Sequence, residues 1–221
     1  MTNELKEAIQ KRLVELYGLV DEYGDLKSSS DINTKLDNQT KLKFVNKLYG
    51  LNNEIDVEKH IKEMFGSDMT IIHEDIKCLS DDAEYFFRYD LQNKKYQKNE
   101  NGCYDIGLTF GDNEYLISSI KFNAKTNLYT VVAKVQYYGK TSNDTYGPLK
   151  SDLYEDYSRK KTIDVSDIKA EYEEEYKSGD EVNYYAEIFE VYKDRIPQGT
   201  FTFEKINDTY ALVGVEISKG E

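Results

Sequence analysis

The segment YLISSIKFNAKTNLYTVVAKVQYY, residues 115–138, has the clearest structural pattern in this amino-acid sequence. In its second half apolar and polar side chains alternate, the apolar ones being Tyr129, Val131, Ala133, Val135 and Tyr137. A repeat of two residues is the period of a β-strand with one face in the core and the other in water. Residues 115–122 form a first arm and the polar residues 123–127 a turn, so the segment predicts an antiparallel hairpin.

Strand patterns lie on both sides of this hairpin. Short segments rich in β-branched and aromatic residues predict strands at 70–78, 85–90, 95–97 and 104–109. Residues 139–163 are irregular, but the chain ends on a second clear hairpin, with arms at 200–205 and 210–217 around Asn207-Asp208. Strands joined by hairpins form an antiparallel sheet.

The first third of the chain has the longer period of amphipathic helices. Over residues 3–22, apolar side chains recur every three or four positions, at Leu5, Ile9, Leu13, Leu16 and Val20. A second helix is predicted over 40–49, before Gly50, and a third from Asp56 as N-cap to Gly66. Residues 182–194 fit a further helix better than a strand.

The order of these elements predicts an α+β fold, in which N-terminal helices pack on a curved antiparallel sheet. We expect a helical N-terminal part over residues 1–66 and a sheet part over 67–221, together forming one continuous domain. The chain lacks the alternating strand–helix–strand pattern of doubly wound nucleotide-binding sheets, so that class of fold is not expected.

The composition is that of an acidic globular protein rich in tyrosine. The 221 residues include 20 Tyr and 9 Phe, which compensate for a hydrophobic fraction of only 39%, because each buried aromatic side chain removes roughly 150–250 Å² from water. A net charge of −13 repels phosphate backbones, so no nucleic-acid partner is expected. No apolar run approaches the ~20 residues of a membrane span, so a membrane would be reached only through an anchor absent from this chain.

Two cysteines, Cys78 and Cys103, bear on the cellular compartment. We interpret them as small, partly buried hydrophobic residues; the alternative is a disulfide across neighbouring strands, which requires an oxidising compartment. Residues 1–10 contain acids and no apolar stretch, so we expect no signal peptide there. The chain is then either cytoplasmic or separated from a leader or anchor that precedes it.

Reactive centres are sparse in the sequence. His60 and His73 are the only histidines, and neither has another histidine or a cysteine at zinc-ligand spacing, so we expect no metal and no cofactor. No catalytic residue is assigned. If the sheet encloses a cavity, the candidate acid/base group is His73 with Glu74 and Asp75; otherwise His73 is a structural or surface residue.

Two further groups of residues are candidates for binding. Five tyrosines in and after the irregular segment, Tyr137, Tyr138, Tyr146, Tyr154 and Tyr157, are predicted to form an exposed aromatic surface, because aromatic anchors dominate binding energy. The alternative is that most of them pack over the sheet. The acids between residues 171 and 181 are interpreted as a solvated face, with docking of a basic partner as the alternative.

Three stretches give the chain a resemblance to a known group: HIKEMFGSDMTIIHEDI at 60–76, EYFFRYDLQNKKYQ at 84–97 and GTFTFEKINDTYALVGVEI at 199–217. They resemble uncharacterised exported or membrane-anchored proteins of low-GC Gram-positive bacteria. The resemblance implies an ectodomain in which a helical part leads into a curved antiparallel sheet of cystatin-like or NTF2-like type. It covers most of the chain but includes no catalytic signature, and therefore implies no reaction.

These observations predict an extracellular or envelope-anchored domain that acts as a non-enzymatic binding or interaction module. Its partner would be a protein or a cell-envelope ligand. Two alternatives stay open: a small-molecule enzyme or carrier that uses an NTF2-like cavity, and an acidic immunity or inhibitor protein for a basic partner. The second alternative also allows a cytoplasmic location.

Overall fold

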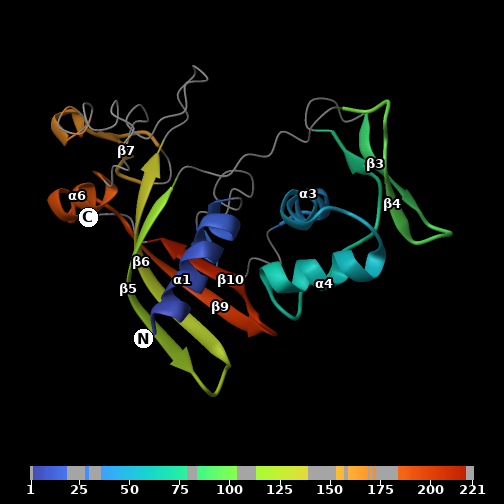
Figure 1. Ribbon diagram of the computed structural model, residues 1–221, viewed down its shortest axis with the longest axis horizontal. Coiled ribbons are helices and arrows are strands. Elements are labelled where there is room, and N and C mark those ends of the chain that lie inside the picture. The colour runs from blue at the N-terminus through green and yellow to red at the C-terminus, as the bar shows by residue number, and fades with distance from the viewer. Residues whose placement is uncertain are drawn as a thin grey trace.

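The predicted hairpin at 115–138 is confirmed in the computed structural model of the chain, where its second strand lies inside the main sheet and its first strand pairs with that second strand at the side of the sheet (Figure 1). Strand β5 (Glu114–Asn123) pairs antiparallel with β6 (Leu128–Tyr138), which pairs on its other side with β9 (Gln198–Ile206). The terminal hairpin is confirmed, since β9 pairs with β10 (Thr209–Ile217). The inward side chains of β6 lie in the core as the alternation predicts.

The structure describes residues 2–18, 28–29, 36–78, 84–103, 113–138, 153–156, 159–168, 170, 172 and 184–217. The strand predicted at 104–109 lies outside these residues. The same holds for the six acidic residues Glu171, Glu173, Glu174, Glu175, Asp180 and Glu181. The described part confirms the α+β class: several helices and an open antiparallel sheet.

Three short strands complete the main sheet, whose order is β1-β10-β9-β6-β7-β8 with β5 beside β6. Strand β1 (Ser28–Ser29) pairs with β10. Strands β7 (Leu153–Tyr154) and β8 (Thr162–Ile163) continue from the end of β6, within the segment that the sequence left irregular. They are too short for a two-residue period to reveal them.

Helix α1 (Asn3–Arg12) and a π-helical turn, Leu13–Tyr17, lie across one face of the main sheet (Figure 1). The predicted helix over 3–22 is confirmed as far as residue 18, and the hydroxyl of Thr2 caps its N-terminus. The predicted stripe is buried at Ile9, and also at residues 13 and 16. The π turn adds Tyr17 to the core, where its ring meets Phe201 at 4.9 Å between centroids.

Two consecutive helices, α3 (Asn38–Tyr49) and α4 (Glu54–Phe65), lie beside this sheet with their axes in clearly different directions, and α4 contacts β10 (Figure 1). Both predicted helices are confirmed, but the predicted N-cap of the second is wrong. The side chain of Asn53, not Asp56, caps α4 by accepting a hydrogen bond from the Asp56 N–H at 3.1 Å. Asp56 belongs to the first turn, where its negative charge stabilises the helix by interacting with the positive end of the helix dipole.

A second sheet, β2-β3-β4, stands at the far side of α4 (Figure 1). Strands β3 (Tyr85–Asp90) and β4 (Lys95–Lys98) match the prediction, but only β2 (Ile76–Lys77) of the predicted strand 70–78 is paired. Our first interpretation of the cysteines is wrong: Cys78 and Cys103 form a disulfide, with Cα atoms 6.0 Å apart, that closes this unit.

Two apolar cores hold the described residues together. The larger core joins α1, α3 and α4 to the inner face of the main sheet and to β2, so it includes residues from both predicted parts of the domain. The smaller core lies at the opposite end, under helix α6 (Tyr184–Val191), with Ile188 fully buried against β7 and β8 residues. Among the described residues, no helix is both long and apolar enough to cross a bilayer.

Candidate ligand-binding site

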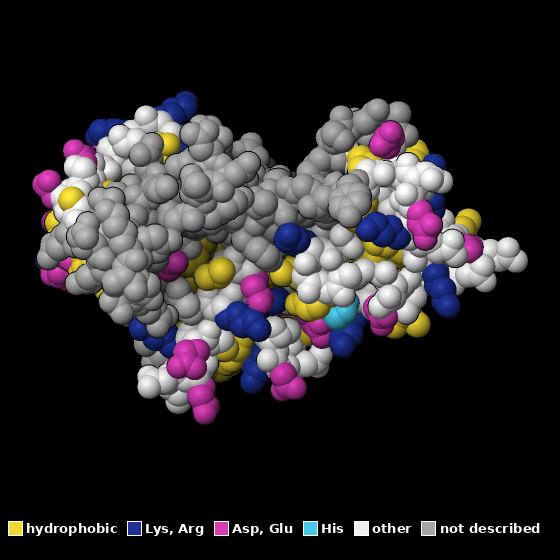
Figure 2. Space-filling model, turned by 45° about the horizontal axis from the view of Figure 1, so that its top comes forward, with side chains coloured by type: hydrophobic (Ala, Val, Ile, Leu, Met, Phe, Trp, Pro, Cys, Tyr) yellow, Lys and Arg dark blue, Asp and Glu magenta, His cyan; other side chains and the backbone are white. Residues whose placement is uncertain are grey.

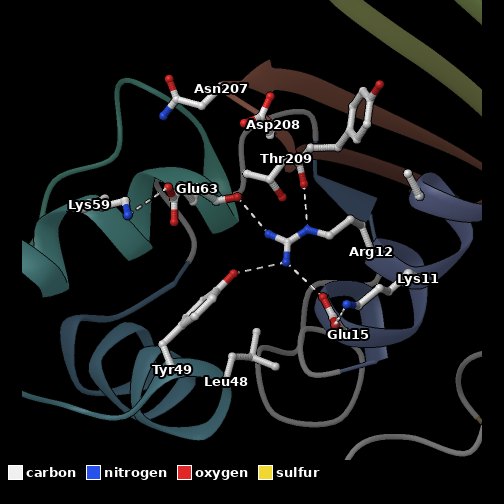
Figure 3. Close-up of a pocket in the computed structure, with 12 residues that line it drawn as sticks. Lys11, Arg12, Glu15, Leu48, Tyr49, Lys59, Glu63, Asn207, Asp208 and Thr209 are labelled. Atoms are coloured by element: carbon white, nitrogen blue, oxygen red, sulfur yellow. Dashed lines mark hydrogen bonds and ion pairs between the residues drawn. The ribbon is translucent and has the colours of Figure 1, made fainter. Parts of the chain in front are cut away.

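A pocket of about 630 Å³ opens where α1, α3, α4 and the β9–β10 turn meet (Figure 3). Its size is within the ~300–1,000 Å³ of typical small-molecule sites. Four chain segments, far apart in sequence, supply its lining: Ala8, Lys11, Arg12, Glu15, Leu48, Tyr49, Lys59, Glu63, Asn207, Asp208, Thr209 and Tyr210. We call this the Arg12 pocket.

Arg12 is the structural centre of the pocket. Its guanidinium donates from Nε to the Tyr210 carbonyl at 2.8 Å and from Nη2 to the Glu63 carbonyl at 2.8 Å. Nη1 donates to the Glu15 carboxylate at 2.9 Å and to the Tyr49 hydroxyl at 3.2 Å (Figure 3). Because the guanidinium is planar and has four partners, it holds α1, α3, α4 and β10 in a fixed arrangement. The pocket is therefore formed before any ligand arrives.

An aromatic ring of fixed orientation stands at the side of the pocket. Tyr49 is held by the hydrogen bond from Arg12 and by stacking on His60, with ring centroids 4.1 Å apart and planes 2° apart. Nδ1 of His60 lies 3.1 Å from the Glu63 carboxylate. Although both contacts fix the ring, Tyr49 remains 38% exposed to solvent. The pocket thus presents an oriented aromatic surface to solvent.

The β9–β10 turn supplies polar side chains that have no hydrogen-bond partner in the part of the chain that the structure describes. Asn207 occupies the left-handed region with φ of +53°, which asparagine tolerates well. The side chains of Asn207, Asp208 and Thr209 make no hydrogen bond to other residues that the structure describes. An amide, a carboxylate and a hydroxyl are therefore free to bind a ligand.

The charged groups of the lining balance each other. Three cations face three anions, and two of the pairs are loose: Lys11–Glu15 at 3.7 Å and Lys59–Glu63 at 3.8 Å. Both lysines are mostly exposed. On the face that Figure 2 shows, acidic and basic side chains are likewise interspersed over the described surface. The site has no strong preference for a cationic or an anionic ligand.

The predicted acid/base residues do not come together. His73 lies between the β3–β4 hairpin and α4. Its Nδ1 is 2.8 Å from the Tyr96 hydroxyl of β4, and its Nε2 is 3.6 Å from the Glu58 carboxylate of α4. Glu74 accepts from the Asn38 amide, and Asp75 accepts from Arg88 and from the backbone N–H of residue 89. Each of the three has a structural partner of its own, and none lines the Arg12 pocket.

A hydrogen-bonded cluster lies around His73. The Tyr89 hydroxyl donates to the Glu54 carboxylate, which also pairs with Lys94 at 3.0 Å. These two bonds hold the pKa of Glu54 below its usual value, and the same carboxylate raises the pKa of Tyr89 to about 12. Burial also raises the pKa of the Tyr96 hydroxyl well above its usual value. The cluster attaches the hairpin to the first turn of α4.

The predicted aromatic surface is wrong for two of its five tyrosines. Tyr137 is fully buried, and Tyr138 is 4% exposed. The Tyr137 hydroxyl lies 2.7 Å from that of Tyr17, so the residue continues the core pattern of β6 instead of leaving it. Tyr154 is half-buried, packed against the main core. Tyr146 and Tyr157 lie outside the described residues.

Metal binding has no support in the residues that the structure places. No group of three or more His, Cys, Asp or Glu side chains among them is arranged to hold an ion. The chain was also compared with known proteins: no protein-family model matches it, and no curated protein or solved structure is significantly similar to it. The Arg12 pocket therefore has to be interpreted from its own chemistry.

Sequence reasoning missed this pocket, although one signal was present. Arg12 lies three residues after Ile9, on the flank of the apolar stripe of α1 where a surface helix would carry a hydrophobic residue. A cation in that position indicates a buried partner. Its partners, however, come from α3, α4 and β10, and no local pattern shows that these segments meet.

Proposed function

We propose that this protein is a non-enzymatic binding module of the cell envelope, exposed outside the cytoplasmic membrane, and that it holds a polar ligand in the Arg12 pocket. The observation that carries the proposal is the guanidinium of Arg12, 6% exposed as a residue and fixed by four hydrogen bonds at the junction of four segments. Preorganisation of this kind lowers the entropy cost of binding.

The chemistry of the lining supports binding over catalysis. The twelve lining residues include no Ser, Cys or His, the side chains most used as nucleophile or proton shuttle. The carboxylates of Glu15 and Glu63 are both paired with cations within the protein. A pocket of fixed polar groups without an activated one is suited to holding a ligand unchanged.

The proposed location is supported by the disulfide Cys78–Cys103, since such bonds persist mainly in oxidising compartments. The arrangement of α1 across the meander β5, β6, β9 and β10 supports a cystatin-like or NTF2-like relationship as part of the same proposal. Under this proposal, residues 19–112 and 139–197 are long insertions between the elements of a simple helix-and-meander core.

The test is ligand mapping by NMR. ¹⁵N-labelled protein is titrated with a soluble enzymatic digest of a Gram-positive cell wall, which contains both glycan and peptide fragments. We expect amide shifts concentrated at Lys11, Lys59 and Asp208, three lining residues from three different elements. Shifts that are absent, or that gather around His73 instead, would overturn the proposal.

A matched pair of charge reversals sharpens this test. Lys59→Glu removes a donor from the lining, while Lys62→Glu changes an exposed lysine of the same helix outside the pocket. The first variant is expected to weaken the response about fivefold, the loss of roughly one hydrogen bond, and the second to leave it unchanged. Equal effects of the two variants would indicate general charge attraction and no pocket.

A further inference from the structure

We propose that the ligand class of the Arg12 pocket is carbohydrate: an uncharged oligosaccharide whose first ring packs against Tyr49 and whose hydroxyls bind the 207–209 turn. This inference rests on the proposed function and specifies the chemistry of the same site. Three features of the lining support it independently of one another: the fixed aromatic ring, the unused polar groups and the balance of charge.

The ring of Tyr49 has the properties of a stacking platform. A nearly parallel histidine ring at 4.1 Å fixes the plane of the ring, and the hydrogen bond from Arg12 fixes the position of its hydroxyl. Its exposed part can therefore receive the apolar C–H face of a sugar ring without losing side-chain freedom on binding. A flexible surface tyrosine would lack this advantage.

The 207–209 turn matches the hydrogen-bonding needs of adjacent hydroxyl groups. Each sugar hydroxyl both donates and accepts, so recognition requires donors and acceptors side by side. The Asn207 amide offers both, the Asp208 carboxylate accepts only, and the Thr209 hydroxyl offers both; none of the three is used within the described protein. Lys59 adds a donor from α4 on the neighbouring wall.

The charge balance argues against the competing ligand classes. A phosphate or carboxylate ligand would meet Glu15, Glu63 and Asp208, and a cationic ligand would meet Lys11, Arg12 and Lys59. Each therefore meets repulsion as well as attraction. An uncharged ligand that forms hydrogen bonds with either kind of group meets no such conflict.

An aromatic row continues from the pocket along the sheet, which fits a ligand of more than one ring. Tyr210 lines the pocket; its ring meets that of Tyr129 at 5.3 Å between centroids, and Tyr129 meets Phe122 at 4.7 Å. Phe122 and Tyr129 are opposite each other in the β5–β6 register and so share a face. Phe122 is 52% exposed, although it is a large apolar side chain.

The experiment is a calorimetric and NMR titration of the full chain with three uncharged tetrasaccharides, chitotetraose, maltotetraose and cellotetraose. The tetrapeptide Ala-Glu-Lys-Ala serves as the competing class. We expect at least one sugar to bind with shifts at Tyr49 and Asp208, and the peptide to give none. If no sugar binds at millimolar concentration, or only the peptide does, the carbohydrate inference is overturned.

Two substitutions and two matched controls complete the design. Tyr49→Leu is expected to weaken sugar binding about tenfold through loss of the stacking surface, and Asp208→Ala about fivefold through loss of a hydrogen bond. Tyr85→Leu, on the distant strand β3, and Lys125→Ala, in the other hairpin turn, should bind as the wild type does. Sugar binding that neither pocket variant weakens would contradict the assignment.

The titration with the cell-wall digest distinguishes failure of the carbohydrate inference from failure of the proposed function. Binding of the digest at the Arg12 pocket without binding of any pure sugar overturns the ligand class but leaves the binding module in place. Absence of binding in both titrations overturns both proposals. Because the Asp208 side chain is exposed and forms no hydrogen bond with any residue that the structure describes, its variant should fold normally and keeps the test decisive.

Discussion

Strand β6 of the main sheet has a paired neighbour on each side, and Val131, Ala133 and Val135 on its inner face are fully buried. Strand β4 of the small sheet is paired along its length with β3 and has an isolated bridge, Lys95 to Asn53, on its other side. Tyr96 is the only one of its four residues that is buried. The main sheet is thus stabilised by apolar burial along whole strands. The small sheet has too little apolar surface for that and depends on individual bonds.

Those bonds are the disulfide, the Tyr89–Glu54 hydrogen bond and the contacts of Asp75 with Arg88 and the β3 backbone. Each is directional and involves a particular atom pair. Substitutions in the two regions should therefore differ in size and in how far their effects spread. The comparison can be tested in four ways.

The largest effect is expected from Phe201→Ala in the main sheet. Phe201 is fully buried and packs edge-on against Tyr17, so truncation leaves a cavity and lowers the free energy of unfolding by about 3–5 kcal/mol. Phe122→Ala, half-exposed on β5, should cost less than about 1 kcal/mol. Urea denaturation measures both, and similar losses for the two variants would contradict an apolar basis for this sheet.

Removing the disulfide should have a somewhat smaller and more local effect. The double variant Cys78→Ser/Cys103→Ser opens a loop with a sequence separation of 25 residues, which corresponds to about 3 kcal/mol. Hydrogen exchange should speed up in β3 and β4 and stay slow in β5 and β6. Wild-type protein in reducing buffer is the control. Equal loss of protection in both sheets would show that they do not unfold separately.

The junction between the regions is tested by a pair of glycines. Gly66, after α4, has φ of +110°, and a Cβ there would lie 2.7 Å from Cγ1 of Val213 on β10; Gly50 has φ of +77° with open space around it. Gly66→Ala should cost about 2–3 kcal/mol and Gly50→Ala about 1 kcal/mol. Adding Val213→Ala should recover part of the first loss only. Thermal unfolding measures these differences, and equal losses at both glycines would exclude the close contact with β10.

The smallest effect concerns Glu54→Gln in the small sheet and depends on pH. The folded pKa of Glu54 lies below its ordinary value of 4.5, because Tyr89 and Lys94 bind the ionised form. Its contribution to stability is therefore complete above pH 4.5 and lost as the pH falls through the folded pKa. The difference in Tm between wild type and variant should be constant from pH 6 to 8 and shrink progressively as the pH falls below 4.5.

Glu100, which is exposed at the end of the β3–β4 hairpin, provides the control Glu100→Gln. It should show no such pH dependence. At the alkaline end, the Tyr89 hydroxyl must keep its proton to donate; its pKa is raised from 10.0 to about 12, so the same bond is lost as the pH rises through that range. A wild-type advantage that does not change at all as the pH falls below 4.5 would mean that Glu54 acts through packing.

The contrast between the two sheets also explains what the sequence could predict. The hairpins 115–138 and 200–217 follow from side-chain alternation alone, because one buried face fixes the register. The helices followed from their apolar stripes and from Gly50 and Gly66. Between residues 70 and 75 the same β-rich composition forms no ladder, because the backbone groups of Ile72 bond to the Asn38 side chain of α3 and the Asp75 carboxylate accepts from the β3 backbone.

The candidate site could not be predicted from the sequence for a related reason. Tyr137 and Tyr138 were expected at a surface because they lead into the irregular segment and aromatic anchors dominate binding energy, but the Tyr17 hydroxyl offers Tyr137 a polar partner inside the core. The Arg12 pocket depends on contacts between residues up to 198 positions apart. Periodicity describes one element at a time, whereas this site exists only where several elements meet.

The π-helical turn at Leu13–Tyr17 has a consequence for how this chain can change in evolution. A π turn accommodates one residue more than an α-helical turn, and here it lets Arg12 face α3 and α4 while Tyr17 faces β6. Deleting a single residue, such as the exposed Val14, would rotate these two side chains relative to each other. Insertions and deletions should therefore be far less tolerated in this one turn than in the hairpin loops, which a deletion scan of residues 13–17 and 124–127 can establish.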